Sequence, residues 1–130
     1  MTTLSRRQAR RQALFLLYQW DLSGRELGSQ YAGEIDPWAR TLAEAVVAEA
    51  EELDATITEA AEGWTADRLG AVERSALRAA VHELRAADVP PEVAINEAVA
   101  FAKRYASEDA ARFVNGILGR IQREEAGGSA

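Results

Sequence analysis

Apolar residues recur every three or four positions along most of this chain, which is the pattern of helices that bury one face. No segment shows the polar and apolar alternation, bounded by hairpin turns, that is typical of a β-strand. The spacing predicts helices over about 6–22 and 69–87, and two more after Pro91 and Ser107. We therefore expect an all-α fold of about six or seven helices.

Capping residues mark several helix boundaries. Ser5 and Gln8 fit a capping box, and Asp36 followed by Pro37 fits an N-cap and a first helical residue. The helical stretch over 38–61 lacks an unbroken apolar stripe, so we expect it to be partly buried, or broken in its second half.

The chain has the length and composition of one compact domain, with 130 residues of which 48% are hydrophobic. We place this domain at 1–123, and we expect the polar, glycine-rich residues 124–130 to form a flexible C-terminal tail. The sequence has no cysteine, no apolar run near the roughly 20 residues of a membrane span, and no secretory signal at its start. We expect a soluble, cytoplasmic protein.

Side chains suited to catalysis are scarce. His82 is the only histidine and stands on the polar face of its helix, and there is no glycine-rich phosphate loop. The adjacent Glu51 and Glu52 point in different directions on a helix, so they make a poor catalytic pair. We therefore expect no enzyme activity, no cofactor and no metal site.

Positive charge is concentrated near the start of a chain whose net charge is −6. Four arginines precede the first acid, Asp21, and Tyr18 shares a helix face with Arg7 and Arg11. Arginines that neutralise phosphates beside a ring that stacks on bases are typical of single-stranded RNA binding. The pattern indicates an RNA site made of Arg6, Arg7, Arg10, Arg11 and Tyr18. A helix kept soluble by its arginines, with Tyr18 in the core, fits the composition equally well.

A second basic set lies on the last two helices: Lys103, Arg104, Arg112, Arg120 and Arg123. The two sets would merge if the terminal helices pack side by side. Alone, the second set is more typical of a solvated helix face.

Several blocks of sequence resemble the NusB family over nearly the whole chain. They are the arginine-rich start with Leu17 and Tyr18, the segments 72–84 and 89–103, and the segment 113–118. The motifs VAINEAV at 93–99 and FVNGIL at 113–118, in this order and spacing, are the most specific. The resemblance implies an all-α fold of two packed three-helix groups and a role without catalysis.

The resemblance also implies a function and partners. NusB proteins are transcription antitermination factors that pair with NusE, a small-subunit ribosomal protein, and the pair binds the boxA segment of ribosomal RNA leader transcripts. The complex joins other Nus factors on RNA polymerase, so that elongation continues past terminators. Of the RNA site, the resemblance covers Arg6, Arg7, Arg10 and Tyr18, whereas Arg11 rests on the charge pattern of this chain alone.

The NusE surface is expected in the second half of the chain. The candidates for it are Glu73, Arg74, Arg78, Phe113 and Leu118. One departure from the family pattern is Gly119, which stands where an acidic residue is common, so we expect this chain to lack any contact that the acid makes.

Two other functions remain open at this point. The chain is also similar to the helical domain that guides ribosomal RNA cytosine methyltransferases to RNA, and it could be a stand-alone relative of that domain. Alternatively, it is a helical scaffold or a homodimer that uses its first helix for protein contact. A homodimer could also be a storage state that masks the RNA surface.

Overall fold

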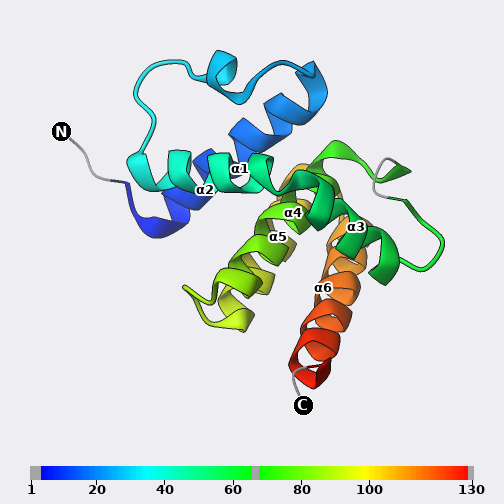
Figure 1. The fold of residues 1–130 in the computed structure, drawn as a ribbon. Coiled ribbons are helices and arrows are strands. Elements are labelled where there is room, and N and C mark those ends of the chain that lie inside the picture. The colour runs from blue at the N-terminus through cyan, green and yellow to red at the C-terminus, as the bar shows by residue number, and fades with distance from the viewer. Residues whose placement is uncertain (1–3, 66–67, 129–130) are drawn as a thin grey trace.

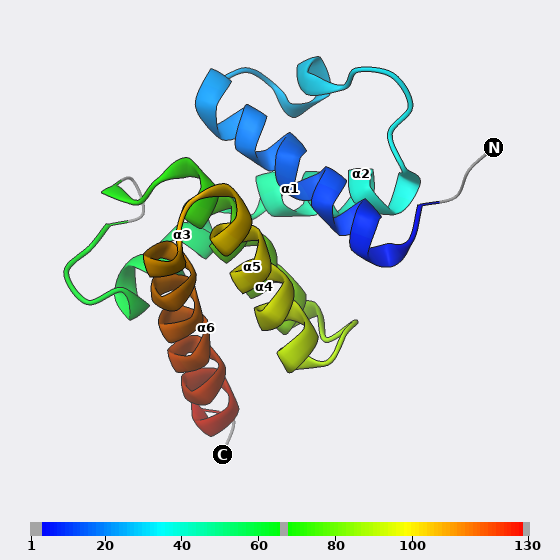
Figure 2. The same cartoon turned by 180° about the vertical axis from the view of Figure 1, so that it is seen from behind.

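The computed structural model describes residues 4–65 and 68–128 (Figures 1 and 2). Within these ranges the chain forms six α-helices, one 3₁₀ turn and no strand, which confirms the all-α expectation. In chain order the elements are α1 (Arg6–Ser23), η1 (Leu27–Gln30), α2 (Pro37–Ala48), α3 (Ala50–Ala60), α4 (Ala71–Ala86), α5 (Pro91–Tyr105) and α6 (Glu108–Gly128).

The predicted capping residues begin the first two helices. The Ser5 hydroxyl accepts a hydrogen bond from the backbone N–H of Gln8, and the Gln8 side chain accepts one from the N–H of Ser5, so the capping box of α1 is complete. The Asp36 carboxylate caps α2 by accepting hydrogen bonds from the backbone N–H groups of Trp38 and Ala39, and Pro37 is the first helical residue. The long helical stretch is broken, which was one of the two expectations for it, but the break lies near its middle: α2 ends at Ala48, and α3 starts in a new direction after Glu49.

Helix α4 lies at the centre of the fold and contacts α1, α2, α3, α5 and α6. Its side chains Leu77 and Val81 are fully buried. They join Leu17 of α1 and Leu118 of α6 in one hydrophobic cluster. Helices α4, α5 and α6 pack together as one group, α1 packs on α2, and α3 lies mainly against α4 and α6 (Figures 1 and 2).

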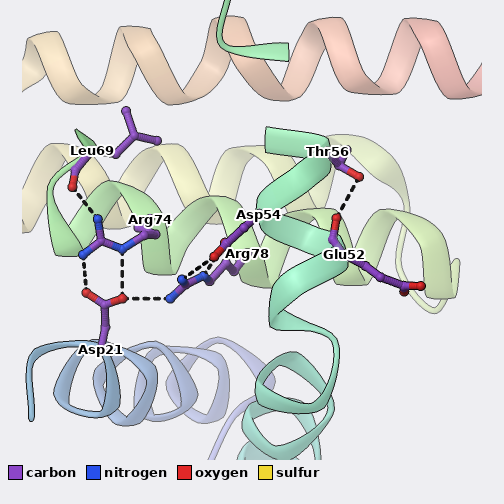
Figure 3. Close-up of polar contacts among 7 residues, drawn as sticks. All are labelled: Asp21, Glu52, Asp54, Thr56, Leu69, Arg74 and Arg78. Carbon is purple, nitrogen blue, oxygen red and sulfur yellow. Dashed lines mark hydrogen bonds and ion pairs between the residues drawn. The ribbon is translucent and has the colours of Figure 1, made fainter. Parts of the chain in front are cut away.

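A network of ion pairs joins α1, α3 and α4 (Figure 3). Asp21, near the end of α1, accepts hydrogen bonds from Arg74 and Arg78 of α4, with 2.8 Å from Arg78 Nη1 to Asp21 Oδ1. Arg78 also makes two bonds of 2.7 Å to Asp54 of α3, and its guanidinium lies 5.4 Å from the centre of the Trp20 ring. Arg74 and Arg78 of α4 are therefore packed between helices, with only 15% and 9% of their side chains exposed.

We predict that acid weakens this network. Burial alone would raise the pKa of Asp21, but its hydrogen bonds and ion pairs with Arg74 and Arg78 outweigh burial and hold the pKa below its usual value. The ionised Asp21 carboxylate therefore stabilises the fold fully at pH values above its unfolded-state pKa of about 4. This stabilisation is lost as the pH falls through the lower pKa that Asp21 has in the folded state. Urea denaturation of the wild type and of Asp21→Asn should give free energies of unfolding whose difference is constant above about pH 5 and shrinks in stronger acid. A difference that stays constant down to pH 2 would contradict this role of Asp21.

The expected flexible tail is helical over most of its length, since α6 continues to Gly128. Ion pairs hold these last turns: Arg120 contacts Glu124 one turn later at 2.8 Å, and Arg85 of α4 contacts Glu125 at 3.0 Å. The apolar stripe ends before them, so hydrophobic periodicity gave no sign of the extra turns. Residues 129–130 of the expected tail lie outside the described residues.

No helix in the described ranges is both long and apolar enough to cross a membrane. The same residues contain no group of three or more histidine, aspartate or glutamate side chains placed to hold a metal ion.

Candidate nucleic-acid interface

A groove with a volume of about 460 Å³ lies between α1 and α5, and we call it the α1–α5 groove. The two helices are separated in the sequence by α2, α3 and α4, and they lie on the side of the molecule shown in Figure 2. The groove is lined by Arg7, Arg10, Arg11 and Leu14 of α1, and by Glu97, Ala100, Phe101, Lys103, Arg104 and Tyr105 of α5.

Four cationic side chains of this groove are exposed to solvent: Arg7, Arg11, Lys103 and Arg104. Within the described part of the chain, no acid pairs with Arg11 or Arg104. Arg7 contacts the one acid of the groove, Glu97, at 3.0 Å, but 72% of the Arg7 side chain is exposed. Such exposed pairs contribute about 0–1 kcal/mol, so a phosphate can compete for Arg7.

The structure corrects the prediction for Arg10. Its side chain is 4% exposed, and two hydrogen bonds of 2.9 Å join its guanidinium to the buried carboxylate of Glu83 on α4. The guanidinium also lies 5.2 Å from the centre of the Trp38 ring of α2. Arg10 precedes Leu14 by four residues and Leu17 by seven, so it lies on the buried stripe of α1, and this spacing was the sequence signal that should have excluded it. Arg10 therefore fixes α1 to α2 and α4.

Arg6 and Tyr18 lie on α1 outside the groove lining. The exposed guanidinium of Arg6 lies over the Trp38 ring, 4.3 Å from its centre, so it faces α2 at the margin of the basic surface. Tyr18 is half-buried, and its RNA contact stays a prediction.

Three other aromatic rings cluster at the groove, and two of them, Phe101 and Tyr105, are part of its lining. Phe15 of α1 lies 5.4 Å from Phe101 and 4.9 Å from Tyr105 of α5, measured between ring centres. Phe15 and Tyr105 were not among the predicted site residues, because ninety residues separate them and only the packing of α5 beside α1 brings them together.

The second basic set divides between two surfaces. Lys103 and Arg104 of α5 join the α1 arginines in the groove. On α6, Arg112, Arg120 and Arg123 line a different hollow, where Arg120 is paired with Glu62 and Glu124. The prediction required the two terminal helices to pack side by side. In the structure, the cations that join those of α1 come from α5 instead.

The five candidates for the protein-partner surface fall into two groups. Glu73 and Phe113 line a hollow of about 460 Å³ beside the exposed Trp64, and we call this the Trp64 surface. The other three are not available there: Leu118 is fully buried on the core stripe of α6, and Arg74 and Arg78 belong to the ion-pair network.

Comparison with known proteins gives matches over most of the chain. The family model described as the NusB family matches residues 7–123. A transcription antitermination protein NusB of Rubrobacter xylanophilus is 45% identical over 122 residues, which is 88% of each chain. That of Saccharopolyspora erythraea is 42% identical, over 90% of this chain and 86% of the relative.

Solved structures give the same result for the fold. The solution structure of NusB from Aquifex aeolicus matches with a TM-score of 0.78 and 34% identity, covering 96% of this chain and 92% of that one. A crystal structure of the antitermination factors NusB and NusE in complex with double-stranded RNA matches with a TM-score of 0.81 and 34% identity, covering 91% of this chain and 96% of that one.

Proposed function

The chain belongs to the NusB family, and from this premise we propose that it is an antitermination factor that binds boxA RNA of ribosomal RNA transcripts together with NusE. It acts without catalysis, as one helical domain, in the cytoplasm. The bound pair joins other Nus factors on RNA polymerase and promotes processive elongation. The observation that carries this proposal is the exposed basic α1–α5 groove on a chain whose net charge is negative.

The groove has the positive charge that an RNA backbone requires. Arg7 and Arg11 extend from one wall, and Lys103 and Arg104 from the other, so a strand lying between α1 and α5 meets cations on both sides. Binding releases the counterions of the phosphates that these side chains neutralise, and this gives an affinity that falls as salt rises. Arg6 adds charge at the margin, and Arg10 holds α1 in place through Glu83.

A titration of labelled boxA RNA tests the proposed function. The protein alone, NusE alone and the mixture are each titrated into boxA RNA and into an RNA of scrambled sequence. We expect the mixture to bind boxA more tightly than either protein alone, and more tightly than it binds the scrambled RNA. Equal affinity for both RNAs, or no gain from NusE, would contradict the proposal.

Light scattering in the same buffer tests the homodimer alternative. A chain that binds RNA as proposed leaves the arginines of α1 free, so it should be a monomer, or a dimer that RNA dissociates. A tight dimer that covers Arg7 and Arg11 and persists with saturating RNA would favour the scaffold instead.

We further propose that NusE docks on the Trp64 surface. Trp64 is 52% exposed although tryptophan is large and apolar, and it lies beside Glu73, Leu69 and Phe113. Exposed tryptophans of this kind contribute much of the binding energy at protein interfaces. Replacing Trp64 with alanine should weaken the NusE complex more than tenfold, which corresponds to about 1.4 kcal/mol, as measured by isothermal titration calorimetry.

The matched control for Trp64 is Leu22, another exposed large apolar residue, which lies near the end of α1. Leu22→Ala should leave NusE affinity unchanged. If both substitutions weaken the complex equally, or neither does, NusE does not dock on the Trp64 surface.

A further inference from the structure

The aromatic cluster at the α1–α5 groove consists of one buried ring and two exposed ones. Phe101 is 5% exposed and forms its base, whereas Phe15 and Tyr105 are 37% and 36% exposed. Phe15 meets both other rings edge-to-face, at interplanar angles of 71° and 74°. Phe101 is part of the hydrophobic core, and this explains why it is buried. About a third of Phe15 and of Tyr105 stays exposed to water.

The exposed rings are placed among the cations of the groove. Phe15 follows Arg11 by one helical turn, which is about 6 Å along the axis of α1. On the other wall Tyr105 follows Arg104 directly, and the Arg104 guanidinium lies 5.5 Å from the centre of the Tyr105 ring. A nucleotide whose phosphate contacts Arg11 or Arg104 therefore has its base within reach of a ring.

The packing of the three rings also prepares them for a ligand. Phe15 and Tyr105 contact each other at 4.9 Å between ring centres, and both contact Phe101 below them. Edge-to-face contacts fix the ring orientations before a ligand arrives, so little side-chain freedom remains to be lost on binding.

The charges decide what kind of ligand fits. Among the described residues that line the groove, Arg7, Arg11, Lys103 and Arg104 outnumber the single acid, Glu97, so the surroundings of the rings are positive. An apolar segment of a protein would leave these cations without partners, whereas a nucleotide supplies a phosphate for the cations and a flat base for the rings. Bases within a duplex are already stacked on their neighbours, so only an unpaired base offers a free face.

We propose that the rings of Phe15 and Tyr105 form a stacking site for one unpaired base of the RNA strand held in the α1–α5 groove. This inference rests on the proposed RNA-binding function and adds to it a base contact next to the phosphate contacts. It also predicts that the groove takes a single strand in preference to a duplex.

An abasic scan tests the stacking site. The protein alone is titrated with single-stranded boxA RNAs, each lacking one base and retaining all of its phosphates. For wild type, loss of the stacked base should weaken binding about 5- to 150-fold, which corresponds to about 1–3 kcal/mol. In the double variant Phe15→Leu with Tyr105→Leu, removal of that same base should not lower the affinity further. The leucine substitutions and the removal of the base eliminate the same contact.

Two controls separate stacking from charge and from folding. The leucine variant should keep the salt dependence of wild type, since it removes no cation, and Tyr105→Phe should keep wild-type affinity, since it keeps the ring. The single variants Phe15→Leu and Tyr105→Leu, each measured separately, cover the case in which the double variant loses its fold.

The outcomes distinguish the two proposals. RNA could bind with the expected salt dependence while the effect of removing each base is the same in wild type and in the leucine variant. In that case the proposed stacking site is wrong, and the proposed phosphate contacts in the groove are still supported. Equal competition by a blunt duplex of the same length would also overturn the stacking site. If no RNA binds to the protein in any arm, the stacking site is wrong, and the proposed function fails as well if the mixture with NusE also leaves boxA RNA unbound.

Discussion

Replacing Arg10 with alanine is expected to lower the free energy of unfolding by about 3–5 kcal/mol. The reason is the carboxylate of Glu83, whose side chain is 6% exposed and which has the Arg10 guanidinium as its ion-pair partner. Without that partner the carboxylate is left buried and uncompensated. A loss of this size is a large part of the 5–15 kcal/mol by which a domain is usually stable. Urea denaturation followed by circular dichroism measures it.

Arg11 is the matched control for Arg10. The two arginines are neighbours in sequence, but Arg11 is exposed and, among the described residues, makes no ion pair. Arg11→Ala should therefore change stability by no more than about 0.5 kcal/mol. The double variant Arg10→Met with Glu83→Leu should recover most of the lost free energy of unfolding, because it leaves no unpaired charge buried. An Arg10→Ala variant as stable as Arg11→Ala would show that the Arg10–Glu83 pair does not hold α1.

Removing Arg11 and Arg104 together is expected to weaken RNA binding by the protein roughly fiftyfold at 50 mM salt. These two side chains lie on opposite walls of the α1–α5 groove, and no acid pairs with either in the described residues. For each phosphate contact to a single strand, the logarithm of the binding constant falls by about 0.7 for each tenfold rise in salt. The expected loss of affinity at 50 mM salt is the sum of the contributions of the two lost contacts. Fluorescence anisotropy of labelled boxA RNA measures it.

The control removes two exposed arginines outside the groove, Arg25 and Arg40. It lowers the net charge of the chain by the same amount, so it separates a local contact from long-range attraction. The Arg25→Ala with Arg40→Ala variant should bind RNA within about twofold of wild type at this salt. Similar losses in both double variants would mean that overall charge, and not the groove, attracts the RNA.

Local sequence patterns were enough to predict the helices and several of their ends. The capping residues Ser5 and Asp36 begin α1 and α2, and the interrupted apolar stripe after Trp38 indicated the break between α2 and α3. These features depend on residues within one or two helical turns of each other, so the sequence contains them directly. The last turns of α6 were missed because one of the ion pairs that hold them comes from α4, through Arg85.

The site was predictable only in part, for the same reason. The concentration of arginines in α1 was visible, and the spacing along α1 placed Arg10 on the buried stripe, but the groups that pair with these arginines lie in other helices. Arg10 meets Glu83 seventy-three residues later, and Arg78 meets Asp21 fifty-seven residues earlier. Both partnerships arise only when α4 packs against α1. The meeting of Phe15 with Tyr105 likewise depends on tertiary packing, which no local pattern contains.

The central claim is that exposed cations of the α1–α5 groove neutralise RNA phosphates, and the salt dependence of boxA binding tests it most directly. With four groove cations in contact, a plot of log K against log salt for the wild type should have a slope of about −2.8. The Arg11→Ala with Arg104→Ala variant should give about −1.4, and the Arg25→Ala with Arg40→Ala variant should keep the wild-type slope. Equal slopes for wild type and the groove variant would contradict the claim.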